Sequence, residues 1–258
     1  MNKISLLFIL SVLITFSAYA QDDIKITHAP YLQNLGENEV TVVWTANKPS
    51  IGWVELAPDD GTHYYQTERP KFFNAKNGIK LTSTVHSVHL TGLKPGTRYR
   101  YRVYSQEVLS HVGWRVIYGN VAATSVYGKQ PLTFLTSDHG RQSVNFAMVN
   151  DIHGKSDVLE KLVSHCDLKK TDMFLFNGDM VSIFNNEKEI FEGFMDKATE
   201  LFASEIPMYY TRGNHETRGS FATAFQDYFS PKQEHIYYMF RQGPVCFVIL
   251  DSGEDKPD

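Results

Sequence analysis

Three short polar runs, each following an apolar segment, constrain the fold of the second half of the chain. The runs are Asp151-Ile152-His153, Gly178-Asp179 and Gly213-Asn214-His215-Glu216. The apolar segments before them have the length of buried strands, and residues at helical spacing lie between them; strands are expected at 144–149, 173–177 and 207–211, and helices at 158–166 and 190–202. This order predicts a parallel sheet with right-handed crossovers. The three runs would share its carboxyl edge, where ligands bind in such folds.

The residue types in these runs are oxygen and nitrogen metal ligands. Two ions roughly 3.5 to 4 Å apart can activate a water and neutralise a phosphoryl group. A carboxylate such as Asp179 can bridge them, Asp151 and His153 can bind one ion, and Asn214 offers an oxygen to the other, which leaves His215 free to face a leaving group. Each run alone is common in turns and caps. Because they occur in order, spaced by 28 and 35 residues (179 − 151 and 214 − 179), they predict a two-metal site for phosphoester hydrolysis.

The first half, from Ile24 to Thr136, shows short alternating runs between turn residues and no long segment at helical spacing. This pattern predicts an all-β region whose strands bury one face. Val40 to Trp44 is one such strand, and in another the arginines between Tyr99 and Val103 should face solvent. The turn before Tyr99 resembles a tyrosine corner.

The stretch from Glu107 to Tyr127 is longer than an ordinary hairpin and carries Trp114 and Tyr118. We expect these aromatic side chains to contact the second domain, and the alternative is that they line a substrate entrance. The histidines of this half lack the close spacing of metal ligands and are expected on the surface or within strands; they are His28, His63, His86, His89 and His111.

The first twenty residues have the order of a secretory signal peptide. Lys3 is followed by an apolar stretch at 4–16 and by Ala18-Tyr19-Ala20. The stretch is shorter than the roughly 20 residues that span a bilayer. Cleavage after Ala20, a secreted or periplasmic product and no membrane anchor are therefore expected.

Charge and cysteine content narrow the class further. Without Lys3, 24 of the 25 basic residues remain against 29 acidic ones, a formal charge of −5, which gives no support for nucleic-acid binding. Cys166 falls on an expected helix and Cys246 on an expected strand. Two buried free thiols are favoured over a disulfide, although an exported protein permits one.

At the three runs the chain resembles the calcineurin-like metallophosphoesterase superfamily, and with a β-sandwich in front it resembles the purple acid phosphatases. The sandwich itself resembles a fibronectin type III domain. The resemblance implies a signal peptide at 1–20, an all-β sandwich at 21–137 and an α/β metallophosphoesterase domain at 142–258. The implied activity is that of a phosphatase or phosphodiesterase on a small phosphoester substrate.

The resemblance also implies roles at the site. It places a dinuclear centre of iron, zinc or manganese, divalent or trivalent, with a metal-bound hydroxide as nucleophile. Asp151 and His153 would bind the first metal, Asp179 would bridge, and Asn214 would bind the second. His215 would protonate the leaving oxygen, and Glu216 would orient the His215 ring.

Two further residues flank the third run. Arg212 and Arg218 are candidates for contact with a phosphate, and an ion pair with an acid such as Glu216 is the alternative. The oligomeric state, the metal identities and the choice between monoester and diester stay open.

The sequence departs from the family in two places. Purple acid phosphatases have a tyrosine three residues after the aspartate of Gly-Asp, where this chain has Ser182, so no ferric-tyrosinate centre is expected. The family also brings histidines from two later loops, and His235 fits no ligand loop. We therefore expect an incomplete α/β domain that is inactive alone. The alternative is a non-catalytic binding or adhesion protein with a degenerate phosphoesterase remnant.

Overall fold

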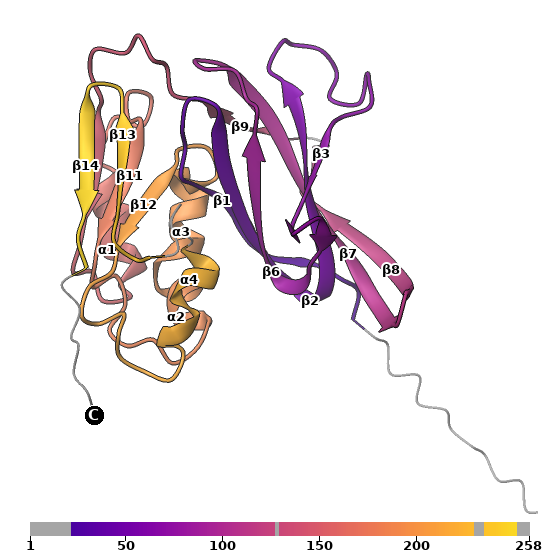
Figure 1. Cartoon of the computed structure of the whole chain (residues 1–258). Helices are drawn as coiled ribbons and strands as arrows, with labels where there is room; N and C mark the ends of the chain where they lie inside the picture. The colour runs from indigo at the N-terminus through magenta and orange to yellow at the C-terminus, as the bar shows by residue number, and fades with distance from the viewer. Residues whose placement is uncertain (1–21, 127–128, 230–234, 252–258) are drawn as a thin grey trace, which may run out of the picture.

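A strand-rich N-terminal region and an α/β C-terminal region lie side by side in the computed structural model (Figure 1). It describes residues 22–126, 129–229 and 235–251, so the expected signal peptide lies outside the described residues. The N-terminal strands are β1 (Ile26–Gln33), β2 (Glu39–Pro58), β3 (Lys71–Phe73), β4 (Ala75–Lys76), β5 (Ile79–Lys80), β6 (Thr82–Thr91), β7 (Arg98–Val112), β8 (Arg115–Ala123) and β9 (Leu132–Leu135). The expected order of a sheet-rich region followed by an α/β region is confirmed.

The N-terminal region is built on the long strands β2 and β7, which pair with each other and with β1, β6, β8 and β9 in antiparallel register. Its core contains Trp44, Val54, Tyr101 and Phe134. The tyrosine corner is confirmed, because the Lys94 backbone N–H donates to the Tyr99 hydroxyl over 2.9 Å. This bond fixes the turn that starts β7.

Strand β2 differs from the expected half-buried strand. Val42 and Trp44 face the N-terminal core, whereas Val43 belongs to a second core made mostly by the α/β region. Arg100, expected in solvent, is also buried and donates to the carbonyl oxygens of Pro58 and Thr62. Alternation marks the strands correctly but does not reveal that a second layer covers the outer face.

The stretch after Glu107 forms the β7–β8 hairpin, which projects away from the α/β region (Figure 1). Trp114, next to its turn, is 96% exposed, so the expected contact with the second domain is wrong. Tyr127 lies outside the described residues.

The C-terminal region has three layers. Its elements are β10 (Phe146–Val149), α1 (Ser156–Val163), β11 (Met173–Asn177), α2 (Lys188–Ile190), the π-helical turn η1 (Phe191–Met195), α3 (Asp196–Ala198), a second π-helical turn η2 (Thr199–Ala203), β12 (Met208–Thr211), the 3₁₀ turn η3 (Ala222–Ala224), α4 (Phe225–Tyr228), β13 (Tyr238–Gln242) and β14 (Val245–Ile249). Strands β10, β11 and β12 are parallel, as expected. Phe174 and Phe176 face the helices, and Met173 and Leu175 face the β13–β14 hairpin.

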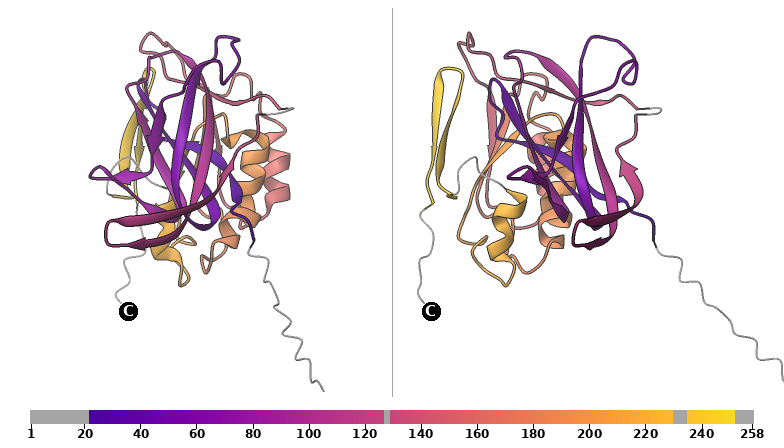
Figure 2. Two further views of the ribbon diagram at one scale, coloured as in Figure 1. Left: turned by 90° about the vertical axis from the view of Figure 1, so that its right-hand side faces the viewer. Right: turned by 45° about the vertical axis from the view of Figure 1, so that its right-hand side comes forward.

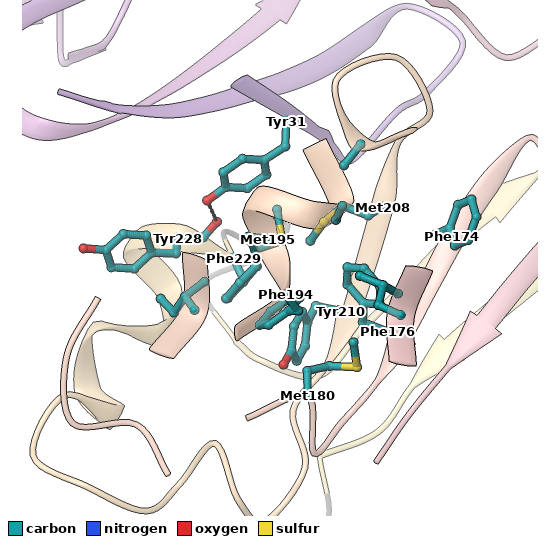
Figure 3. Packing of buried hydrophobic residues seen from close by; sticks show 14 of the residues in the cluster. Tyr31, Phe174, Phe176, Met180, Phe194, Met195, Met208, Tyr210, Tyr228 and Phe229 are labelled. Atoms are coloured by element: carbon teal, nitrogen blue, oxygen red, sulfur yellow. Dashed lines mark hydrogen bonds between the residues drawn. The ribbon is translucent and has the colours of Figure 1, made fainter. Parts of the chain in front are cut away.

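Strand β1 joins the two regions. It pairs antiparallel with β2 and, through Gln33 and Met208, parallel with β12, so one sheet path runs across both regions. Tyr31 of β1 is fully buried in the helix-side core, and its hydroxyl donates to the Tyr228 carbonyl over 2.8 Å (Figure 3). The two regions are therefore held by a buried apolar interface and not by a flexible linker alone.

The helices lie close to the positions expected from the sequence but differ at their ends. The second helix spans α2 to η2 as one continuous helical stretch, close to the expected 190–202, and the views in Figure 2 show it packed beside the strands. Helix α1 begins at Ser156, and its N-cap position is Lys155 without a side-chain cap. Both cysteines are free, as expected, but Cys246 is exposed and Cys166 only half-buried.

Candidate metal centre

The three polar runs form loops at one edge of the parallel sheet. We call them the first ligand loop (150–154, after β10), the second ligand loop (178–182, after β11) and the third ligand loop (212–218, after β12). Val149 pairs with Phe176, and Asn177 pairs with Thr211, so the strands end at neighbouring positions. The expected shared carboxyl edge is thus present.

The first two loops hold their ligand residues in an unusual backbone conformation. Asp151, His153 and Asp179 have positive φ angles of 57°, 49° and 54°, a region that non-glycine residues seldom occupy and that persists only where the surroundings enforce it. Backbone hydrogen bonds supply that constraint: the N–H groups of Asp151 and His153 donate to the carbonyl oxygens of Gly178 and Asp179 over 3.2 and 3.1 Å.

Glycine is required where the second and third ligand loops touch. A Cβ on Gly178, whose φ is +78°, would lie 2.8 Å from the Gly213 Cα. A Cβ on Gly213 would lie 2.3 Å from the Asp179 Oδ1. Two backbones without side chains therefore bring Asp179 beside the residues that follow Gly213.

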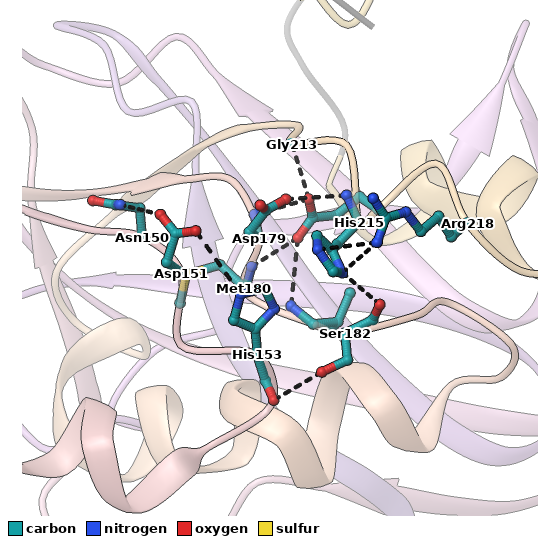
Figure 4. Close-up of polar contacts among 11 residues, drawn as sticks. Asn150, Asp151, His153, Asp179, Met180, Ser182, Gly213, His215 and Arg218 are labelled. Carbon is teal, nitrogen blue, oxygen red and sulfur yellow. Dashed lines mark hydrogen bonds and ion pairs between the residues drawn. The ribbon is translucent and has the colours of Figure 1, made fainter. Parts of the chain in front are cut away.

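Side chains from all three loops converge (Figure 4). Ligand atoms of His153, Asp179 and His215 lie within 4.8 Å of one another. The Asp151 Oδ1 lies 3.8 Å from the His153 Nε2. The Asn214 side-chain NH₂ donates to both carboxylate oxygens of Asp179 over 3.1 to 3.2 Å, and the Asn214 amide oxygen accepts from Arg218. The structure thus brings together the residues that the sequence nominated as ligands.

These separations suit metal ions. Two ligand atoms, each about 2.0 to 2.2 Å from one ion, lie about 3 to 4.4 Å apart, and the 3.8 Å between the Asp151 Oδ1 and the His153 Nε2 falls in this range. The His153 imidazole with carboxylate and amide oxygens forms a donor set for iron, zinc or manganese. The residues present therefore fit a metal centre.

His215 is held by the second ligand loop. Its Nδ1 lies 2.7 Å from the Ser182 carbonyl oxygen, which can only accept, so Nδ1 carries a proton and Nε2 is the nitrogen left for other chemistry. The Arg218 Nη1 lies 3.2 and 3.1 Å from the two ring nitrogens. Since one donor cannot align with both nitrogens, the guanidinium packs against the ring.

Glu216, expected to orient the His215 ring, binds other partners in the structure. It is 1% exposed, and its carboxylate accepts hydrogen bonds from backbone amides of the second and third ligand loops and from the Tyr210 hydroxyl. Burial, with the Glu216 charge as a second cause, holds the pKa of Tyr210 well above its ordinary value, so the phenol stays a neutral donor. Sequence reasoning missed Tyr210, because nothing in a strand pattern links it to a loop six residues later.

The two arginines have separate surroundings. Arg212 pairs with Asp251, just beyond β14, over 2.7 Å, and not with Glu216. Arg218 lies against His215 and the Asn214 amide, at the exposed side of the site. Of the two, Arg218 is the better placed to reach a bound anion.

A pocket opens beside the centre. It has a volume of about 390 Å³ and is lined by His153 and Ser182 on the ligand side and by Ile183, Glu189 and Glu192 on the far side.

Comparisons with known proteins agree with this geometry. Residues 144–254 match the calcineurin-like phosphoesterase family, and residues 28–118 match the purple acid phosphatase N-terminal domain. The chain thus joins a calcineurin-like phosphoesterase domain to a purple acid phosphatase N-terminal domain, as the sequence predicted. Members of the phosphoesterase family are metal-dependent hydrolases with a dinuclear site. No curated protein gives a significant match.

Among solved structures, the purple acid phosphatase PPD1 from yellow lupin (Lupinus luteus) seeds matches with a TM-score of 0.56 and 16% identity, over 88% of this chain and 46% of that one. The present chain therefore spans about half the length of that structure. An fn3 domain of human collagen alpha-1(XX) chain matches with a TM-score of 0.26 and 18% identity, over 40% of this chain and 89% of that one. The FN5 domain of Drosophila Lar matches with a TM-score of 0.27 and 15% identity, over 43% and 94%.

Proposed function

We propose that the chain is a metal-dependent phosphoester hydrolase acting on small phosphoesters at the three ligand loops. The observation that carries this proposal is the convergence of His153, Asp179 and His215 within 4.8 Å at the carboxyl edge of a parallel sheet. Together with the family match of residues 144–254, this geometry favours hydrolysis over a non-catalytic role.

In the proposed site Asp151 and His153 would hold one metal, Asn214 would hold a second, and Asp179 would serve both. Bound metals would supply charge neutralisation and an activated water. His215, fixed through Nδ1 to Ser182, presents Nε2 to the reacting group and gives a proton to the leaving oxygen. Arg218, packed on the exposed side of His215, contacts the phosphate oxygens.

The proposal extends to location and organisation. The N-terminal sequence supports a cleaved signal peptide and export, and the tyrosine corner supports a fibronectin type III-like sandwich at 21–137 ahead of a catalytic domain at 142–258. None of the helices in the described ranges is long and apolar enough to cross a membrane. Mass spectrometry of the exported protein would test cleavage after Ala20.

Metal binding and hydrolysis test the function directly. The purified protein is loaded with zinc, manganese or iron, its metal content is measured, and hydrolysis of p-nitrophenyl phosphate and of its diester bis(p-nitrophenyl) phosphate is followed. Bound metal and metal-dependent hydrolysis would support the proposal and contradict the expectation that this chain is inactive alone, and the rates on the two esters would decide between phosphatase and phosphodiesterase. A protein that binds no metal and hydrolyses neither ester would support the non-catalytic alternative.

A further inference from the structure

Glu216 lies where the second and third ligand loops meet, and both of its carboxylate oxygens are saturated. Oε2 accepts from the backbone N–H groups of Asp179 and Gly213 over 3.0 and 2.8 Å. Oε1 accepts from the Met180 N–H and from the Tyr210 hydroxyl, each over 2.8 Å. One side chain therefore binds the backbone of both loops.

The burial of this carboxylate needs an explanation. A carboxylate that is 1% exposed loses its hydration, and such a group is tolerated when hydrogen bonds replace the lost water. The five donors are neutral groups, and four of them are backbone amides in loops. These amides lack regular secondary-structure partners, and the buried charge satisfies them together.

The hydrogen bonds that Glu216 accepts come from the part of the site where the backbone is strained. Asp179 has a positive φ of 54°, and the N–H groups of this residue and of the next both donate to Glu216. The Asp179 side chain is fixed in turn, since its Oδ1 accepts from the His215 N–H over 3.0 Å. The conformation that presents Asp179 to a metal is thus enforced by the Glu216 carboxylate at the Asp179 backbone and by the His215 N–H at the Asp179 side chain.

We propose that Glu216 is a positioning residue that sets metal affinity by holding Asp179 and the third ligand loop in register, and not the residue that orients His215. The identity of Asp179 as a ligand rests on the proposed function, whereas the hold on the two loops does not. Loss of an outer partner of a metal ligand commonly weakens metal binding by about 10- to 100-fold.

The variant Glu216→Gln tests this role. Glutamine keeps the shape but replaces one accepting oxygen with an NH₂ group that faces N–H donors, so one pair of bonds is lost. The matched control is Glu189→Gln, because the Glu189 Oε2 also accepts from two backbone amides, those of Asn185 and Asn186, outside the ligand loops. We expect the Kd for Zn²⁺, measured by calorimetry, to rise 10- to 100-fold in Glu216→Gln and less than threefold in the control.

Melting temperature separates positioning from general stability. Equal thermal shifts in the two glutamine variants with weakened zinc binding only in Glu216→Gln support the proposal. An unchanged Kd in folded Glu216→Gln, or equal weakening in both, overturns it. Glu216→Asp keeps the charge, but its side chain is one methylene too short to bind both loops. We expect its Kd for zinc to lie between the values of the unaltered protein and of Glu216→Gln. A Kd as weak as that of Glu216→Gln would contradict the proposal.

Hydrogen exchange on the unaltered, metal-free protein covers the case in which neither variant folds. The amide hydrogens of Asp179, Met180 and Gly213 should exchange with solvent more slowly than is usual in loops. Rapid exchange at all three would overturn the proposal. If the unaltered protein binds no zinc, the proposed function fails while this measurement still decides whether Glu216 holds the loops.

Discussion

His86 in β6 and His215 in the third ligand loop each contact a serine, but their surroundings differ. His86 is fully buried in the middle of a strand, with Nε2 2.8 Å from the Ser50 hydroxyl and the Asn74 amide near Nδ1. His215 sits on a loop at a strand end, where Nδ1 donates to the Ser182 carbonyl oxygen and Nε2 lies on the exposed side beside Arg218. A histidine whose two ring nitrogens are both hydrogen-bonded inside a core stabilises the fold. A histidine at a sheet edge, with one ring nitrogen facing the solvent side of a site, can take part in proton transfer.

The same contrast holds for the carboxylates. Glu216 is buried and saturated with donors, while Asp151 is largely exposed and Asp179 lies between the two. The proposed ligand residues are thus more exposed to solvent than Glu216, the residue proposed to position them. The following predictions test this division, from the largest effect to the smallest.

Asp179→Asn should cause the largest loss. Asp179 is the ligand shared by both proposed metals, and an amide cannot bridge two cations as a carboxylate does. We expect bound metal to fall sharply and phosphoester hydrolysis to disappear, by metal analysis and by assay with p-nitrophenyl phosphate. Retention of both metals with near-normal turnover would remove Asp179 from the bridging position.

His215→Ala should separate metal binding from catalysis. If His215 is a proton donor, the variant keeps its metals while kcat falls by roughly 10² to 10⁴. The loss should be smaller for an aryl phosphate, whose leaving group needs little protonation, than for an alkyl phosphate. Because His215 lies within the ligand group, loss of a metal in this variant would instead make it a ligand.

His86 should make the stability of the sandwich depend on pH. Burial lowers the pKa of His86 to about 4 from its ordinary 6.5, so between these values the unfolded chain takes up a proton that the folded chain refuses. The free energy of unfolding should therefore be unaffected by His86 above pH 6.5 and fall between pH 6.5 and 4, by roughly 3 kcal/mol in total. Denaturant titrations of the metal-free protein across this range measure the effect.

The variant pair His86→Phe and His111→Gln isolates that contribution. His111 is an exposed histidine in β7, so its loss should leave the pH dependence unchanged, whereas His86→Phe should flatten it. Identical pH profiles in His86→Phe and the unaltered protein would show that other groups cause the dependence.

Tyr99→Phe should have the smallest effect. It removes the hydrogen bond from the Lys94 N–H to the Tyr99 hydroxyl, worth about 1 kcal/mol, and leaves the metal centre untouched. Thermal unfolding measures the first change and zinc titration the second. A Kd for zinc that changed with Tyr99→Phe would mean that the sandwich and the ligand loops are more tightly coupled than the comparison of His86 with His215 suggests.

The sequence predicted the α/β order because its signals are local. An apolar run followed by Asp151-Ile152-His153, or by Gly178-Asp179, contains both the strand and the turn, and parallel pairing then places the turns at one edge. The burial of Arg100 and of both faces of β2 could not be read in this way. Alternation reports which side chains share a face, but not which faces another layer covers.

At the site, the sequence by itself determined the residue types: the proposed ligands Asp151, His153, Asp179 and Asn214, and the two glycines that let their loops touch. Only the tertiary structure decided how these residues are held. The hydrogen bond from the Asp179 amide to Glu216 joins residues 37 apart in the sequence, and the one from His215 to the Ser182 carbonyl joins residues 33 apart. Contacts of that range depend on where three strands end in space, which no local pattern encodes.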